Sequence, residues 1–290
     1  MASSPLTPIT IGLPKGRMQE GVLQLLREAG IDVRLGSRGY RPQLSQPWLQ
    51  AKMLKPQNIV EMLHVGSRDI GFAGADWVAE LKADVVELLD TGLDPVRIVV
   101  AAPAGLLENG ALPNRPLLVA SELDHLTRDW IARRGLRATF VRSYGSTEVF
   151  PPEDADCIVD IVASGDTLRA NHLMIVDEVL KSSTRLYAHK SSMDDQHKRE
   201  TIEAMVLLLR SVLNARQRVM VEVNVAPEHL EKLSAIMPCM REPTVQQLHH
   251  GAGYAVKAAV PRADLADLIP RIKAAGGTDV VVYNLAQIIP

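Results

Sequence analysis

The apolar positions in the first part of the chain alternate between short continuous runs and helical spacing. Residues 9–13 and 69–73 are apolar runs next to turn residues, and the β-branched run at residues 96–102 ends at Pro103. Such runs are typical of buried strands. After the first run, apolar residues recur at helical spacing until Gly30, which supplies a stop signal. The alternation predicts an α/β fold in which helices connect parallel strands.

The same alternation begins again after Pro103. Strands are predicted at residues 117–120, 138–142, 156–161 and 184–189. Helices are predicted at residues 123–134, through Val176 and Leu180, and at about residues 195–216. Because the strand count restarts, we expect two α/β lobes, the first made of residues 1–100 and 190–216 and the second of residues 101–189. Such lobes bind ligands in a cleft at the carboxyl ends of their strands.

The last part of the chain, residues 217–290, has a different pattern. Val219, Val221, Val223 and Val225 alternate with polar or flexible residues, as in a strand with one buried face. A helix, two short strands, a second helix and a final strand follow. The order β-α-β-β-α-β predicts a small ferredoxin-like domain. Domains of this shape often bind small regulatory ligands, although the fold alone does not establish a function.

Composition narrows the class of protein. The chain has 290 residues, of which 47% are apolar and 23% charged, and its formal net charge is -2. This balance argues against nucleic acid as a partner, which would favour a basic excess. The two cysteines do not form a disulfide or zinc pattern, and neither a signal peptide nor an apolar run long enough to span a membrane is recognisable. We therefore expect a cytoplasmic protein without a membrane partner.

The most informative segment is residues 156–168, where a predicted strand ends in a loop of small and hydroxylated residues. Ser164 and Thr167 supply hydroxyl donors, and Gly165 allows the backbone to approach a ligand closely. Backbone N–H groups at the start of the following helix favour an anion. Asp160 stands at the strand end, where a carboxylate can accept from ribose hydroxyls. The segment predicts a phosphate-binding loop, although an ordinary strand-to-helix turn with Thr167 as N-cap is also compatible.

Two other loops carry candidate ligand contacts. Lys15 and Arg17 follow the first strand, where two cations suit a polyphosphate, although they are also compatible with solvated surface charge. Residues 144–148 end in Glu148 and are suited to hold another part of the ligand, or to form a surface turn. Asp69 and Asp76 are better explained as an edge acid and a helix cap. The sequence has no Walker-type loop, zinc spacing or nucleophile elbow.

These segments resemble those of a known family, the ATP phosphoribosyltransferases that open histidine biosynthesis, in its long form. Residues 12–17 (Gly-Leu-Pro-Lys-Gly-Arg) resemble the family's N-terminal motif, and residues 54–59 and 68–76 resemble its next block. Residues 145–148 and 155–171 resemble its phosphoribosyl-diphosphate signature. Residues 241–244, within the C-terminal β-α-β-β-α-β segment, resemble the histidine-sensing domain. The resemblance covers nearly the whole chain.

The resemblance implies a fold and an activity. The fold is a two-lobed, periplasmic-binding-protein-like catalytic core followed by a regulatory ferredoxin-like domain. The reaction transfers the phosphoribosyl group of phosphoribosyl diphosphate to N1 of ATP and releases diphosphate. Magnesium is the implied cofactor, histidine is the implied inhibitor, and assembly into a homo-oligomer (dimers and hexamers) is expected.

The resemblance also implies roles for individual residues. The loop that holds the phosphorylated ribose would consist of Asp160, Ser164, Gly165, Asp166, Thr167 and Leu168. The residues near the reacting groups would be Glu148 at the ribose or its metal, and Lys15 and Arg17 at the nucleotide and diphosphate. The contacts of the inhibitor would include Asn224 and Thr244. The exact metal ligands stay unknown.

Two features depart from the family pattern, and two other functions stay open. Asp166 places a carboxylate in the phosphate loop, where it would repel a phosphate unless its side chain points away. Residues 150–154 replace smaller residues before the signature.

One alternative function is a non-catalytic two-lobed binding protein with a sensor domain, but such a protein would not need the loop at 160–167. A phosphoribosyltransferase for another base would share that loop, and only substrate tests separate it.

Overall fold

The computed structural model describes residues 8–36 and 39–289. By the density of internal contacts the chain divides into two compact units. The first comprises Met1–Gln24 and Ile31–Glu203, and the second comprises Leu25–Gly30 and Ala204–Pro290. Each unit has its own sheet and its own buried core.

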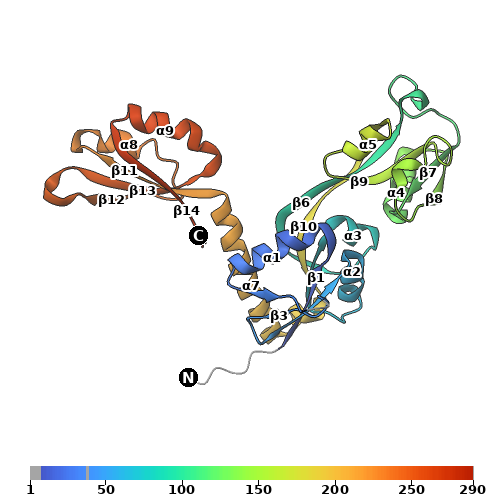
Figure 1. The fold of residues 1–290 in the computed structure, drawn as a ribbon, viewed down its shortest axis with the longest axis horizontal. Coiled ribbons are helices and arrows are strands. Elements are labelled where there is room, and N and C mark those ends of the chain that lie inside the picture. The colour runs from blue at the N-terminus through green and yellow to red at the C-terminus, as the bar shows by residue number, and fades with distance from the viewer. Residues whose placement is uncertain (1–7, 37–38, 290) are drawn as a thin grey trace. The chain divides into compact units, whose positions relative to one another are not determined.

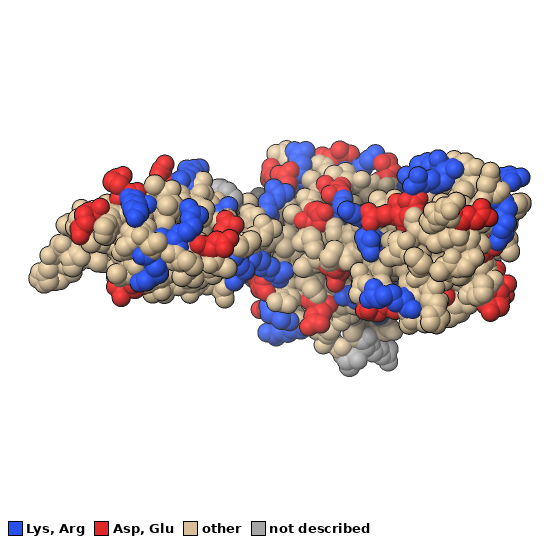
Figure 2. All heavy atoms as spheres, turned by 90° about the horizontal axis from the view of Figure 1, so that it is seen from above, with Lys and Arg blue, Asp and Glu red and all other residues tan. Residues whose placement is uncertain are grey.

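Charges of both signs lie side by side on the face shown in Figure 2 and do not gather into one broad basic area.

The first unit is built on an eight-stranded mixed sheet with the order β4-β1-β5-β10-β6-β9-β7-β8 (Figure 1). One end of the sheet is parallel and consists of β1 (Ile9–Pro14), β4 (Leu49–Leu54) and β5 (Ile70–Gly74). The other parallel end consists of β7 (Leu117–Ser121), β8 (Ala138–Arg142) and β9 (Cys157–Val162). Two long strands join the ends, β6 (Val86–Pro103) and β10 (Leu173–Ala188), and they pair antiparallel with each other. The α/β class is confirmed.

Helices connect these strands. Those of the first unit are α2 (Pro56–His64), α3 (Ala75–Glu80), α4 (Asp124–Arg134), α5 (Asp166–Ala170), α6 (Lys190–Asp194) and the first parts of α1 (Gln19–Glu28) and α7 (Gln196–Arg216), whose remaining residues belong to the second unit. A small ribbon of β2 (Val33–Arg34) and β3 (Gln43–Leu44) lies beside them. Helix α2 packs so closely on the sheet that a Cβ on Gly71 would lie 2.5 Å from Cγ2 of Ile59. The glycines of β1 and β5 therefore allow Ile59 to enter the core.

The structure corrects the helix that we predicted through Val176 and Leu180. That segment is part of β10, and the helix after the phosphate loop is only α5, which ends at Ala170. An apolar run such as 173–176 fits either a strand or a helix when it is read alone. Its pairing with β6, from Leu173 opposite Pro103 to Ala188 opposite Val86, decides for the strand. For the same reason our strand at 96–102 covers only the second half of β6.

The second unit contains the end of α7 and a four-stranded antiparallel sheet with the order β12-β13-β11-β14. Its elements follow in the order β11 (Arg218–Val225), α8 (Leu230–Ser234), β12 (Thr244–Gln247), β13 (Tyr254–Pro261), α9 (Leu265–Ala274) and β14 (Gly277–Asn284). The four alternating valines of β11 are at most 2% exposed and form the centre of this core. The predicted ferredoxin-like order is confirmed. Within the described residues, no helix is both long and apolar enough to cross a membrane.

Candidate active site

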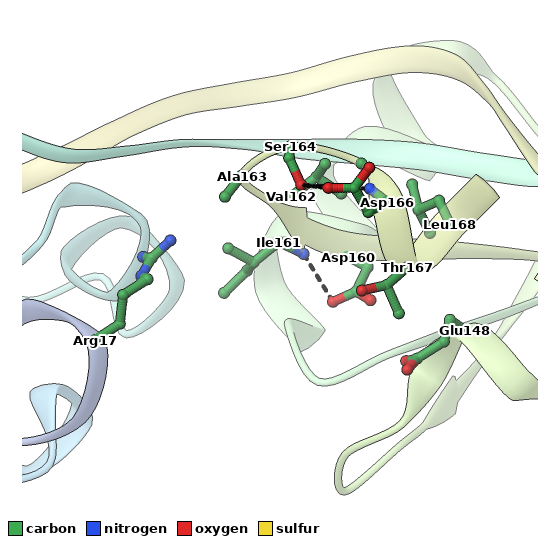
Figure 3. Close-up of a pocket in the computed structure, with 11 residues that line it drawn as sticks. Arg17, Glu148, Asp160, Ile161, Val162, Ala163, Ser164, Asp166, Thr167 and Leu168 are labelled. Carbon is green, nitrogen blue, oxygen red and sulfur yellow. Dashed lines mark hydrogen bonds between the residues drawn. The ribbon is translucent and has the colours of Figure 1, made fainter. Parts of the chain in front are cut away.

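A pocket of about 320 Å³ lies at the carboxyl end of β9. Its lining consists of Arg17, Glu148 and the continuous segment 160–168, as Figure 3 shows. The structure therefore brings together all the predicted catalytic and phosphoribosyl-binding residues except Lys15. The ammonium of Lys15 instead lies 3.5 Å from the centroid of the Tyr40 ring, a cation–π contact outside this pocket.

The loop after β9 has the backbone that the sequence suggested. Gly165 has φ +81°, a left-handed conformation that residues with a side chain rarely adopt, and it immediately precedes α5. Leu168 is only 3% exposed and anchors the loop in the hydrophobic core. Gly165 occupies the N-cap position without a side-chain cap, so the prediction that Thr167 is the N-cap is wrong. The Thr167 hydroxyl is exposed and lines the pocket.

Asp160 is the most strongly perturbed acid of the pocket. Burial, with smaller contributions from the charges of Glu148 and Glu122, raises the pKa of its carboxyl to about 6. The backbone N–H of Ile161 donates to Oδ1 of Asp160 at 2.7 Å and partly opposes this rise. A carboxyl with such a pKa gains stabilisation from any donor or cation that binds beside it. A ligand donor or a cation beside Asp160 would therefore favour its ionised form.

Glu148 reaches the pocket from a short turn, Thr147–Val149, that follows β8. The turn is fixed by Ser143 and Thr147, which are both buried and whose hydroxyl oxygens lie 2.7 Å apart in a hydrogen bond. Ser146 before it has φ +48°, so the chain reverses sharply there. Glu148 follows β8 and Asp160 lies near the end of β9, two strands that β7 separates in the sheet, and both side chains line one pocket.

Arg17 comes from the turn Gly16–Met18 that follows β1. Met18 is buried and anchors the turn, whereas Arg17 is exposed. In Figure 3 its guanidinium points toward the side of the pocket lined by Ile161 and Ala163. Among the described residues no ion pair neutralises Arg17. The pocket therefore has an available cation opposite Glu148 and Asp160.

The carboxylate of Asp166 is paired with neighbouring side chains of the loop. Its carboxylate accepts from the hydroxyl of Ser164 at 2.5 Å and forms an ion pair with Arg169, one turn further along α5. The hydrogen bonds from Ser164 and Arg169 lower the pKa of Asp166. Arg169 also donates to the Ser164 carbonyl at 3.3 Å. Arg169 was not predicted from the sequence, although its position three residues after Asp166 in a helix gave a signal.

The two predicted regulatory residues lie on the open face of the second unit's sheet. Asn224 in β11 donates to Oδ2 of Asp279 at 3.2 Å. Thr244 in β12 lines a second pocket, of about 560 Å³, together with Met220, Met240, Arg241 and Lys257 among others. Asn224 does not line that pocket. The strand register places Thr244 beside Lys257, and Lys257 beside Glu222.

No group of three or more His, Cys, Asp or Glu side chains converges as a metal site within the described part of the chain. Three acids line the pocket, and of these Asp166 is paired with Arg169, so the pocket offers the carboxylates of Glu148 and Asp160. Such a set fits a hard divalent cation that takes its remaining ligands from substrate oxygens and water.

An α/β core with an acid, a hydroxyl-bearing loop and an arginine around one pocket is typical of the class of α/β proteins that bind phosphorylated ligands. The family model for ATP phosphoribosyltransferase matches residues 55–211, and the model for the C-terminal domain of that family matches residues 215–287. The chain belongs to the ATP phosphoribosyltransferase family, in its long form with the C-terminal domain. It is a transferase that joins the phosphoribosyl group of phosphoribosyl diphosphate to N1 of ATP, the first step of histidine biosynthesis.

Relatives and a solved structure agree with this assignment. The ATP phosphoribosyltransferase of Pelotomaculum thermopropionicum is 36% identical over 97% of this chain and 99% of its own length. That of Chlorobium phaeobacteroides is 36% identical over 97% of each chain. Among solved structures, a chain of the ATP phosphoribosyl transferase (HisG:HisZ) complex from Thermotoga maritima superposes with a TM-score of 0.64 at 26% identity. It covers 71% of this chain and 98% of the Thermotoga chain.

Proposed function

We propose that the phosphoribosyl transfer takes place in the pocket that Arg17, Glu148 and segment 160–168 line. The observation that carries this proposal is the position of Asp160, a partly buried carboxylate of raised pKa beside the hydroxyl-bearing loop. Asp160 would accept from the ribose hydroxyls, and Ser164, Gly165 and Thr167 would surround the 5-phosphate. The catalytic core would comprise residues 1–100 with 190–216 and residues 101–189, as the sequence predicts.

The pocket suits a transfer in which positive charge develops on the ribose as diphosphate leaves. Carboxylates near the sugar stabilise that charge, and Asp160 and Glu148 are placed to do so. Arg17 on the opposite side would neutralise the departing diphosphate, and Lys15, two residues before it, would extend this positive region toward the nucleotide. No general base is required, because N1 of adenine already carries a lone pair. Positioning of the two reactants therefore accounts for most of the catalysis.

Magnesium is the proposed cofactor. Glu148 and Asp160 would hold it together with substrate oxygens, and the high pKa of Asp160 is the observation that fits a cation there, since a nearby positive charge favours the ionised carboxylate. When bound, the metal would supply additional charge neutralisation for the diphosphate. Asp160 and Glu148 would at the same time orient the ribose.

Residues 217–290 are proposed to bind histidine as a feedback inhibitor. The pocket beside Thr244 offers charged and apolar groups together, from Arg241, Lys257 and Met220, which suits an amino acid. Asn224 would contribute from the neighbouring part of the same sheet face. Inhibition would follow from a difference in histidine affinity between active and inactive arrangements. The protein is further proposed to act in the cytoplasm as a homo-oligomer of dimers or hexamers.

The test is diphosphate release from phosphoribosyl diphosphate with magnesium and ATP, compared for the wild type, Asp160→Asn and Thr167→Ala. We expect kcat/KM to fall by about 100-fold in Asp160→Asn, because an oriented charge is lost from the transition state. Asp154→Asn is the matched control, since Asp154 is an exposed acid just before the same strand, β9. Full activity of Asp160→Asn and Thr167→Ala would refute the site. Activity with another base instead of ATP would point to a different phosphoribosyltransferase.

A further inference from the structure

Asp166 is an acid within the loop that is proposed to hold a phosphate, and the structure shows what it binds. Its Oδ2 accepts the only proton of the Ser164 hydroxyl, at 2.5 Å, and its Oδ1 pairs with the guanidinium of Arg169 (Figure 3 shows the first of these contacts). Arg169 is also fixed to the loop itself, through its bond to the Ser164 carbonyl at 3.3 Å. One carboxylate thus occupies two side-chain donors of the loop, the Ser164 hydroxyl and the Arg169 guanidinium.

These donors are the type that a phosphate requires. A serine hydroxyl has one proton to donate, so Ser164 cannot serve Asp166 and a phosphate at the same time. A guanidinium binds carboxylate and phosphate oxygens with the same geometry, so Arg169 can exchange one partner for the other. A phosphate dianion beside an ionised Asp166 would meet like charge. The present position of Asp166 is therefore incompatible with a phosphate that takes Ser164 and Arg169 as its donors.

The exchange needs little energy. The side chains of Arg169 and Asp166 are 66% and 76% exposed, and ion pairs between such exposed groups contribute little to stability. Both side chains can turn into solvent without leaving a buried group unpaired. Gly165 adds room, because a Cβ there would lie 3.3 Å from Nη1 of Arg169 and would restrict its movement.

We propose that Asp166 holds Ser164 and Arg169 in place in the empty loop and is displaced by the 5-phosphate of the substrate, to which both donors then turn. Arg169 is thereby a phosphate-binding residue, and Asp166 is a positioning residue that competes with the phosphate and weakens its binding. This inference rests on the proposed function of the loop. It explains how an acid can stand within a phosphate-binding segment.

The test measures binding of ribose 5-phosphate to the full-length chain by calorimetry. Asp166→Asn keeps the size of the side chain and removes the competing charge, so we expect the Kd to fall about threefold to tenfold. Raising the salt from about 0.05 M to about 0.5 M should shrink that gain, because the effect is electrostatic and exposed. Arg169→Gln should raise the Kd about tenfold or more, and Arg169→Lys should recover part of the loss. Asp154→Asn serves again as the control.

The direction of the change distinguishes competition from a merely structural role. If Asp166 only stabilised the loop, Asp166→Asn would weaken binding, and that result, or an unchanged Kd, overturns the proposal. An unchanged Kd in Arg169→Gln overturns it as well. Thr167→Ala separates this inference from the proposed function. Loss of binding in Thr167→Ala with no effect of the Asp166 and Arg169 variants refutes only the exchange, whereas unchanged binding in Thr167→Ala refutes the loop assignment too.

Discussion

The Nζ atom of Lys198 lies 2.6 Å from Oδ1 of Asp69, so a cation of α7 is paired with a carboxylate at the start of β5. The same carboxylate accepts from the backbone N–H and the hydroxyl of Thr10, each at 2.7 Å, and from the Ser192 hydroxyl at 2.8 Å. Asp69 is only 7% exposed. It therefore joins β1, β5, α6 and α7 through one buried group, which agrees with the structural interpretation of this acid from the sequence.

Asp69→Asn is expected to lower the free energy of unfolding by roughly 3 kcal/mol at neutral pH, because it leaves Lys198 without its partner in a partly buried place. The measurement is thermal unfolding followed by circular dichroism. Asp84→Asn is the control, since it breaks an exposed pair with Lys190 and should change the Tm little. Equal effects of the two substitutions would contradict the role given to Asp69.

The pH dependence gives a second readout of the same group. Burial alone would raise the pKa of Asp69, but hydrogen bonds from Lys198, Thr10 and Ser192 outweigh it and lower the pKa. A carboxyl with a lowered folded pKa contributes stability above its unfolded pKa, and that stability is lost as pH falls through the folded pKa. The Tm difference between wild type and Asp69→Asn should therefore shrink on acidification below about pH 4.

Glu80 provides a helix cap from a different helix. Its two carboxylate oxygens, at the end of α3, accept from the backbone N–H groups of His125 and Leu126 in α4 at 3.1 and 3.0 Å. Glu80→Ala should lower the free energy of unfolding by about 1–2 kcal/mol, because it leaves these donors without an acceptor. Urea unfolding checks this, with Glu61→Ala on the exposed side of α2 as control. A Glu80→Ala variant as stable as the control would mean that water replaces the cap.

Replacing Asp160 should lower the activity of the protein but raise its free energy of unfolding. Its pKa of about 6 exceeds that of an unfolded carboxyl, so the folded state favours the protonated form and loses stability as pH rises through about 6. Asp160→Asn should therefore be more stable than the wild type by about 1–2 kcal/mol at about pH 7.5, with the gain absent near pH 4. Melting curves at both pH values decide this.

The activity of the wild type should fall below about pH 6, and an activity independent of pH from 5 to 8 would contradict a role for ionised Asp160.

Removal of residues 219–290 tests the regulatory half of the proposal. The shortened chain should release diphosphate without sensitivity to histidine, because the proposed histidine pocket lies wholly within the removed part. The assay is the same diphosphate measurement with and without histidine. Thr244→Ala in the full-length chain is the milder companion, and it should weaken inhibition. Unchanged inhibition in the shortened chain would place the inhibitor site in the first unit.

The sequence predicted those parts of the fold that depend on local pattern. The apolar spacing of α7 and the alternating valines of β11 each mark one buried face, and both elements lie where they were expected. The course of β10 could not be predicted in this way, because Val176 and Leu180 fit two periods and only the pairing with β6 decides between them. A local pattern of apolar residues shows which face of a helix or strand is buried. Which strands pair with each other depends on the fold of the whole chain.

In the candidate site, too, the sequence predicted the residues that lie close together in the chain but not those that only the fold brings together. Asp160 and the hydroxyls of Ser164 and Thr167 are adjacent in sequence, so one strand-to-loop segment was enough to group them. The proximity of Glu148 and Arg17 to that segment follows from the sheet order, which spacing does not reveal. Residue types also say little about partners, since the contacts of Asp166 with Ser164 and Arg169 become visible only in the folded loop.

The register of β6 and β10 places Leu173 opposite Pro103, so the segment between them begins and ends at paired positions. A stretch whose two ends meet in this way can be exchanged as a unit, provided that the replacement also supplies a strand that pairs with Arg97–Ala101 of β6, as β9 does. The same junction offers engineers a defined place to graft the corresponding half of another transferase, or to open new chain termini by circular permutation.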